Sequence, residues 1–185
     1  IKETRPWGDG SKQMTRNVYA ARSTRFYDNR PIKVYTDYET ASGQKVNTRV
    51  VNYNYEDSAE VERITAITYA AGVNHQQVTI KETYGEAAAY TYAAGKPKFR
   101  QAVNGVQTWH EYEATTLHNA IHKHSVVIKA NGELVAAQSR KAEEFIATND
   151  TITFEQEFIW DGDNWLLLNT TAYEYDEEKR ITKTT

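Results

Sequence analysis

Apolar or aromatic residues alternate with polar ones in short stretches along most of this sequence, and turn signals separate the stretches. Alternation with a period of two is typical of β-strands, because successive side chains of an extended chain point to opposite faces. Asn104-Gly105 and Asn131-Gly132 each join two such stretches. Asn-Gly favours a tight hairpin turn because both central residues of a type I′ turn need positive φ. We therefore predict an all-β fold of antiparallel hairpin repeats that form one extended, twisted sheet.

The predicted strands follow one another as hairpins. They cover residues 32–39, 46–55, 61–69, 77–83, 90–92, 99–103, 106–112, 125–129, 134–137, 154–160 and 165–171, with a last strand and its return at 173–184 and with turns that include 42–43, 71–74 and 161–164. Helix formers recur at helical spacing only at 137–147 and, more weakly, at 116–124, and even these segments could be strands or irregular insertions.

The domain organisation is simple. Residues 1–16, which contain Pro6, Gly8 and Gly10, are expected to be a connector, and residues 17–185 the repeat domain. The sequence stops at Thr185 within an expected strand. We therefore interpret the chain as a piece of a longer protein.

Composition indicates a thin but ordered fold. The hydrophobic fraction of 39% and the mean hydropathy of -0.74 are low for a chain that surrounds one thick apolar core. The 13 Tyr, 4 Trp and 5 Phe nevertheless argue against disorder, since disordered segments are poor in aromatic residues. A sheet with one wet face and aromatic rings spread along its length accounts for both observations.

Charge and cysteine content limit the partners. The 22 basic and 25 acidic residues are mixed along the chain and give a net charge of -3, and the most basic stretch, at 22–33, is interrupted by Asp28. A nucleic-acid-binding protein normally has a basic patch or stripe. Without cysteine the chain has no disulfides and no thiolate metal ligands, and no stretch is long and apolar enough for a membrane span. We expect no nucleic-acid partner and no membrane span.

His118, His122 and His124 form the histidine cluster of the sequence. On a strand the three imidazoles would share one face and could bind zinc, whereas the alternative is a set of solvated or cross-strand structural histidines. The helical metalloprotease motif needs Glu after the first His, and Asn119 occupies that position. The structural interpretation is favoured, so we expect no cofactor.

Two carboxylate pairs lie near tryptophans, Glu111 with Glu113 and Glu155 with Glu157. Glycosidases use two acids that flank a sugar, and strand alternation would place each pair on one face. A solvated sheet face produces the same pattern.

Residues 161–164 resemble part of a calcium loop, but apolar residues follow where further ligands are needed, so a hairpin turn is expected. We predict no enzymatic activity.

A tyrosine-centred pattern recurs at a spacing of about twenty residues. One copy starts in the segment 90–96 and leads to the next Tyr at 112, and the C-terminal segment 173–184 repeats the theme. Looser copies lie near Tyr55 and at 26–32. The residues that carry the pattern are Tyr90, Tyr92, Gly95, Asn104, Gly105, Tyr112, Tyr173, Tyr175, Asp176 and Arg180.

At these residues the sequence resembles the rearrangement-hotspot (RHS) family, also called YD-repeat proteins. The family motif is Tyr-Asp, two variable residues, Gly-Arg and a β-branched strand. The segment 175–181 is the best match, and Lys179 stands where the family usually has Gly. The copy at Tyr92 keeps Gly95 but has Ala93 in place of Asp.

The resemblance implies a β-hairpin ribbon that coils into a shell, as in toxin-related scaffold proteins that are secreted or displayed on the bacterial cell surface. It implies a structural wall whose partners are neighbouring repeats of the same polypeptide, an enclosed polypeptide or a surface glycan. The self-cleaving aspartate segment of the family is not recognisable here, so its activity is not expected. The alternative function is a β-sheet module that binds carbohydrate or protein through exposed Tyr and Trp.

Overall fold

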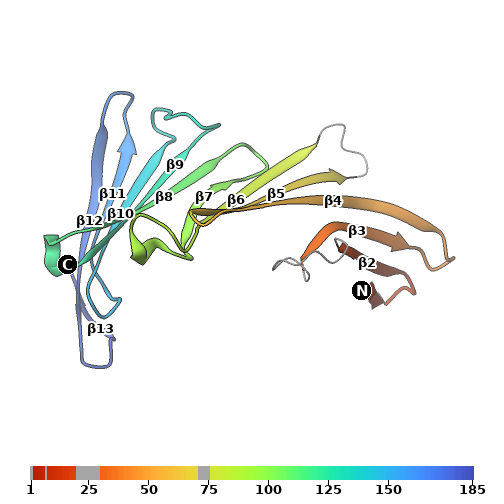
Figure 1. The fold of residues 1–185 in the computed structure, drawn as a ribbon, viewed down its shortest axis with the longest axis horizontal. Coiled ribbons are helices and arrows are strands. Elements are labelled where there is room, and N and C mark those ends of the chain that lie inside the picture. The colour runs from red at the N-terminus through yellow and green to blue at the C-terminus, as the bar shows by residue number, and fades with distance from the viewer. Residues whose placement is uncertain (1, 7, 20–29, 71–75) are drawn as a thin grey trace. The chain divides into compact units, whose positions relative to one another are not determined.

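Thirteen strands are hydrogen-bonded in chain order, β1 to β13, in a computed structural model that describes residues 2–6, 8–19, 30–70 and 76–185 (Figure 1). The strand pairs whose register is described are antiparallel. Helical structure in these residues consists of two 3-10 turns, η1 (Thr91–Ala93) and η2 (Leu117–Asn119), and no described helix is long and apolar enough to cross a membrane. The predicted all-β class with antiparallel hairpins is confirmed.

The chain divides into two units, which are described separately. The first comprises Ile1–Glu56 and Ile64–Ile80, and the second comprises Asp57–Arg63 and Lys81–Thr185. The strands that lie wholly or mostly in the first unit are β1 (Lys2–Pro6), β2 (Lys12–Tyr19), β3 (Pro31–Glu39) and β4 (Lys45–Asp57), while β5 (Val61–Ala70) and β6 (Gln77–Tyr84) contribute residues to both.

Residues 2–16 contain a hairpin rather than the expected connector. β1 pairs with β2 along its whole length, and the side chain of Met14 on β2 is buried. Pro6 ends an edge strand, where a missing N–H is tolerated, and Gly10 has φ 84 in the turn. The Pro and Gly residues that suggested a connector are therefore the turn signals of a hairpin.

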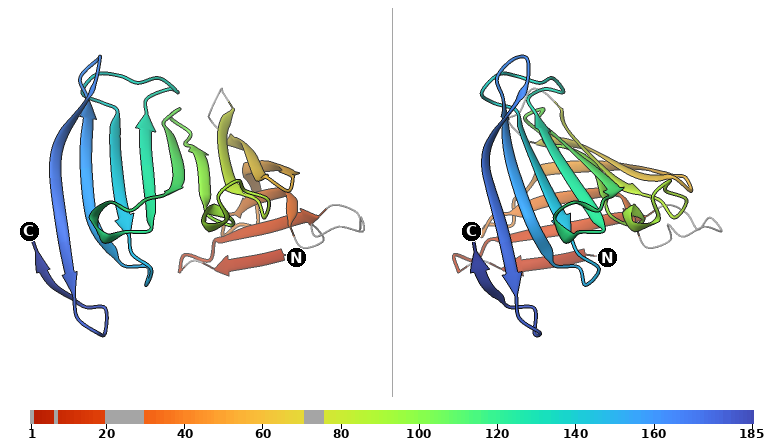
Figure 2. Two further views of the ribbon diagram at one scale, coloured as in Figure 1. Left: turned by 60° about the vertical axis from the view of Figure 1, so that its left-hand side comes forward. Right: turned by 90° about the vertical axis from the view of Figure 1, so that its left-hand side faces the viewer.

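The strands of the second unit form one layer (Figure 2). Its core is correspondingly small: among the described residues of this unit, the buried hydrophobic side chains are Ala93, Phe99, Ala120, Phe145 and Ile146. Stability must therefore come largely from contacts between side chains on neighbouring strands. These strands are β7 (Pro97–Gln101), β8 (Gln107–Ala114), β9 (His122–Lys129), β10 (Arg140–Ile146), β11 (Ile152–Trp160), β12 (Trp165–Tyr175) and β13 (Ile181–Thr184).

Most hairpins predicted from alternation are present. The strands expected at 32–39 and 46–55 correspond to β3 and β4, and those expected at 154–160 and 165–171 correspond to β11 and β12. The turn expected at 71–74 and most of the loose repeat copy at 26–32 lie outside the described residues.

Two local predictions are wrong, and two open ones are decided. The segment 137–147, for which helix and strand were both open, contains β10, which pairs with β9 on one side and β11 on the other, so pairing on both edges outweighs helix propensity. The segment 116–124 forms η2 followed by the start of β9 instead of a helix. The strands expected at 90–92 and 134–137 are instead a connection with η1 and a turn in which Ala137 has φ 60.

The two Asn-Gly turns differ in conformation. Asn131 and Gly132 have φ values of 50 and 84, and the Glu133 N–H donates to Ala130 O at 3.0 Å, as expected for a type I′ turn. In the other pair only Gly105 has positive φ, at 80. Asn-Gly therefore predicts a hairpin at both places, but the expected turn type at only one.

A three-residue turn recurs in four described hairpins, at 40–44, 102–106, 147–151 and 176–180. In each range, the backbone N–H of the first residue donates to the C=O of the fifth, and the N–H of the fourth residue donates to the C=O of the first. This is a hairpin connection that needs a left-handed residue at the fourth position. That residue is Gly43, Gly105, Asp150 or Lys179, with φ values of 83, 80, 64 and 61.

The substitution Lys179→Gly should raise the free energy of unfolding by about 0.5–1 kcal/mol, because Gly takes the left-handed conformation without the cost that a β-carbon brings. Urea unfolding measures the change. The matched control is Glu178→Gly in the same turn, at a residue without positive φ, which should destabilise instead. Equal effects of the two substitutions would contradict a conformational cost at position 179.

Candidate functional site

The strand register of the second unit sorts side chains onto two faces. Tyr112 on β8 lies opposite His124 on β9, and His124 lies opposite Glu144 on β10, so these three side chains share a face. Trp109, three residues from Tyr112 on the same strand, belongs to the other face. We call these the cluster face and the tryptophan face.

A hydrogen-bonded row crosses the cluster face from Glu144 to His110. His124 Nδ1 lies 2.8 Å from Glu144 Oε2, and His124 Nε2 lies 3.1 Å from His110 Nδ1. An ionised carboxylate can only accept, so Nδ1 of His124 carries a proton, and a neutral His124 then accepts from His110 through Nε2. Tyr112 stacks on His124 with the centroids 4.4 Å apart. If both imidazoles were protonated, each facing nitrogen would be a donor and the hydrogen bond between the two rings would be lost.

A second group of rings surrounds His122. Tyr92 stacks on His122 with the centroids 3.5 Å apart, and the Tyr90 hydroxyl lies 2.5 Å from His122 Nδ1. Lys96 Nζ lies 3.0 Å from the centroid of the Tyr92 ring and 5.4 Å from that of Tyr112. The imidazole and the ammonium are too close to Tyr92 to share one side of it, so they cover its two sides.

Burial is the main cause of the pKa shifts of Tyr112 and His110. It raises the pKa of Tyr112 to about 12, and Tyr84 adds to the effect. It also lowers the pKa of His110, with His124 acting in the same direction. The hydrogen bond from His124 lowers the pKa of Glu144. At neutral pH this part of the cluster therefore combines a neutral His110 and a protonated phenol with a carboxylate.

His118 does not join His122 and His124 on one face. It lies in η2 with φ 54, and its ring stacks on Phe154 at 3.8 Å and meets Phe145 edge-on at 4.6 Å. Phe145 belongs to the tryptophan face, opposite to the other two histidines. Within the described part of the chain, no group of three His, Cys, Asp or Glu is placed to hold a metal ion. The three-histidine zinc site considered from the sequence lacks its geometry.

The two carboxylate pairs lie on different faces. Glu111 and Glu113 share the tryptophan face, where Glu113 forms an ion pair with a lysine of β9. Glu155 and Glu157 share the cluster face, and Glu155 accepts a hydrogen bond from Tyr173 at 2.5 Å. Each pair keeps the alternate spacing that the sequence indicates, and one member of each has a structural partner.

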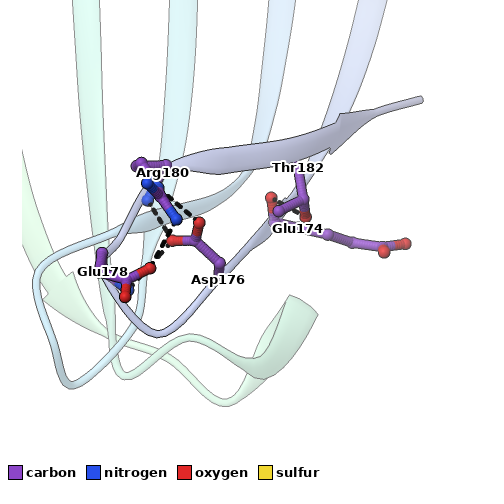
Figure 3. A network of polar contacts seen from close by, with 5 residues as sticks. All are labelled: Glu174, Asp176, Glu178, Arg180 and Thr182. Carbon is purple, nitrogen blue, oxygen red and sulfur yellow. Dashed lines mark hydrogen bonds and ion pairs between the residues drawn. The ribbon is translucent and has the colours of Figure 1, made fainter.

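The Tyr-Asp motif forms the turn between β12 and β13 (Figure 3). Asp176 Oδ1 accepts backbone N–H groups of Glu178 at 3.1 Å and Arg180 at 2.8 Å, and Oδ2 accepts from Arg180 Nε at 2.7 Å. The backbone hydrogen bond from Arg180 is the largest cause of the lowered pKa of Asp176. Beyond the turn, Thr182 Oγ1 donates to Glu174 O at 3.1 Å. The Asp and Arg of the motif thus hold this turn together.

The motif tyrosines occupy two kinds of position. Tyr173 and Tyr175 lie on one face of β12, with their ring centroids 6.4 Å apart. Tyr175 donates to Ile152 O at 2.7 Å and so ties β12 to β11. Tyr90 and Tyr92 lie in the connection before β7 rather than in a strand, and their rings reach the cluster from there.

The remaining motif residues shape turns. Gly95 has φ 74, and its N–H donates to Tyr84 O at 2.9 Å, which closes the connection between β6 and β7. Asn104 Oδ1 accepts a backbone N–H of its own turn at 3.2 Å. A β-carbon on Gly105 would collide with the side-chain oxygen of Asn131 in the neighbouring turn.

Sequence reasoning missed Glu144 and Lys96 as members of this cluster. A local signal existed for part of it, because His110 and Tyr112 alternate on one strand as His122 and His124 do on the next. Bringing the two pairs together requires the register of β8 and β9, which local alternation does not specify.

Comparison with known proteins finds no match to a family model, to a curated protein or to a solved structure.

The free energy of unfolding should fall as the pH decreases from about 7 to about 5. Burial lowers the pKa of His110 and His122, and Lys96 adds to the effect at His122, so the unfolded chain binds more protons in this range. A depressed His pKa stabilises the fold above the unfolded value of about 6.5, and acidification removes that stability. Urea unfolding across this range measures the slope. The double substitution His110→Gln and His122→Gln should flatten it, and an unchanged slope would contradict this assignment.

Proposed function

We propose that this chain is a structural segment of a larger repeat protein, in which consecutive hairpins form part of a shell or scaffold wall. The observation that carries the proposal is the strand order, because each strand pairs with the strands that precede and follow it in the chain. An array of this kind gains stability from contacts between adjacent hairpins instead of from one central core. The small number of buried hydrophobic side chains among the described residues supports the same conclusion.

The Tyr-Asp turn supports an RHS-like origin for the segment. Asp176 and Arg180 together hold the last hairpin turn, and Tyr175 ties its strand to β11. These are the residue types that carry the family motif, in the same order. On this proposal the parent protein is secreted or displayed on a bacterial cell surface, and its wall is passive.

A binding module for carbohydrate or protein is a second candidate, and Trp109 favours it. This residue is 39% exposed on the tryptophan face and lies beside Phe99, with the ring centroids 4.5 Å apart. An aromatic ring that is partly exposed on a sheet suits stacking against a sugar or an apolar side chain. Titration with neutral oligosaccharides tests this candidate: quenching of tryptophan fluorescence that disappears in Trp109→Ala would support it.

The substitution Tyr112→Ala should increase hydrogen exchange in β7, β8 and β9 and leave β11 to β13 protected. Its ring contacts Tyr84, Tyr92 and His124, so its removal loosens neighbouring strands only. The local loss should approach the lower end of the ~3–5 kcal/mol seen for fully buried rings, because Tyr112 is only half-buried. Hydrogen exchange with mass spectrometry resolves the strands.

The matched variant is Tyr175→Ala, which should have the reverse pattern, with increased exchange in β11 to β13 and unchanged protection in β7 to β9. Equal loss of protection in every strand of the second unit, in either variant, would indicate one cooperative core and overturn the repeat-wall proposal.

A passive wall has no turnover, so the purified chain should hydrolyse neither glycosides nor peptides and should retain no stoichiometric zinc after dialysis. Chromogenic glycosides, a labelled casein and metal analysis provide the measurements. Glycoside hydrolysis that is abolished by Glu155→Gln, with folding intact, would contradict the proposal. The control Glu111→Gln changes a carboxylate of the opposite face.

A further inference from the structure

Three basic side chains follow one another on the cluster face along β7. Lys98 and Arg100 share this face by strand alternation, and Lys96 reaches it through its contacts with the Tyr92 and Tyr112 rings. Alternate positions of a strand are about 6.8 Å apart, twice the rise per residue. We call these three side chains the β7 basic row.

Aromatic rings, not carboxylates, position two of these charges. Lys96 Nζ lies 3.0 Å from the centroid of Tyr92, and Lys98 Nζ lies 5.6 Å from that of Tyr84. Among the described residues, none of the three basic side chains of the row forms an ion pair. Lys141 on the tryptophan face, in contrast, pairs with a carboxylate at 3.2 Å. The row thus holds three positive charges without an ion-pair partner among the described residues, two of them over aromatic rings, in a protein of net charge -3.

We propose that the β7 basic row binds an extended acidic polypeptide segment that carries Asp or Glu at alternate positions. Such a segment repeats its carboxylates at about 6.8 Å, the spacing of Lys98 and Arg100 on β7, so two ion pairs form without bending either chain, and Lys96 adds a third positive charge just before the strand. The backbone of β7 already pairs with β6 and β8, so the segment lies on the face and is held through side chains. This inference goes beyond the wall role and does not depend on it.

The rings beside the row favour a polypeptide over a nucleic acid. Single-stranded nucleic acids bind by stacking bases on open aromatic faces. Here His122 and Lys96 cover the two sides of Tyr92, and His124 stacks on Tyr112. What remains accessible is positive charge, since Arg100 is exposed and Lys96 and Lys98 are partly exposed, and this suits carboxylates.

Fluorescence anisotropy with the full chain tests the spacing directly. Two labelled peptides of about ten residues have the same composition, one with Glu and Thr in strict alternation and one with Glu and Thr in two blocks. We expect the alternating peptide to bind at least about fivefold more tightly, and to lose binding between about 0.1 M and about 1 M salt, where the Debye length falls from ~10 to ~3 Å. Equal affinities would overturn the proposed register of charges.

Two charge-removal variants locate the binding. Lys98→Gln with Arg100→Gln leaves Lys96 on its ring and should weaken binding of the alternating peptide by about fivefold or more. Lys129→Gln with Lys141→Gln removes the same charge from the tryptophan face and should leave the affinity unchanged. Circular dichroism checks folding of both. Equal weakening in the two variants, or tighter binding of a single-stranded oligonucleotide of equal charge, would overturn the proposal.

Discussion

Contacts between side chains on neighbouring strands hold the second unit together, because a single layer has almost no interior. On the tryptophan face, Phe99 meets Trp109 with the centroids 4.5 Å apart, and Phe145 meets Phe154 at 5.8 Å, each pair directly opposite in register. One such pair contributes only ~0.2–1 kcal/mol, so the sheet depends on many of them. The loss of one contact then destabilises adjacent strands more than distant ones.

Basic side chains placed over aromatic rings supply part of the cover that a second layer gives to most sheets. In the first unit Arg16 lies 4.3 Å from the centroid of Tyr35, and in the second Lys141 lies 4.2 Å from that of Phe158. Lys and Arg shield apolar surface with their methylene groups while the charge remains hydrated. This arrangement lets aromatic rings lie on a sheet face that no second layer covers.

Local alternation predicts most of the hairpins because it depends only on residues that are adjacent in the chain. It does not decide between helix and strand at 140–146, where pairing on both edges makes a strand of helix-forming residues. The candidate site has the same limit: His122 and His124 share a face by spacing alone, but Glu144 joins them only through the register of two strands. His118, in contrast, has the right spacing from His122 and His124 but does not share their face. Its backbone is left-handed, with φ 54, and its ring lies on the other face against Phe154.

The recurring hairpin turn forms with or without glycine at its left-handed position, and the Tyr-Asp motif is one of the cases without it. Gly fits the left-handed position without a steric penalty. All four turns have a side-chain acceptor for a backbone N–H: Thr40 Oγ1, Asn104 Oδ1 and Asn149 Oδ1 accept one each, and Asp176 Oδ1 accepts two. The motif copy that has Ala93 in place of Asp keeps its Gly yet forms the 3-10 turn η1. In these two copies the aspartate, more than the glycine, accounts for the turn, because it satisfies the backbone groups that a tight reversal leaves unpaired.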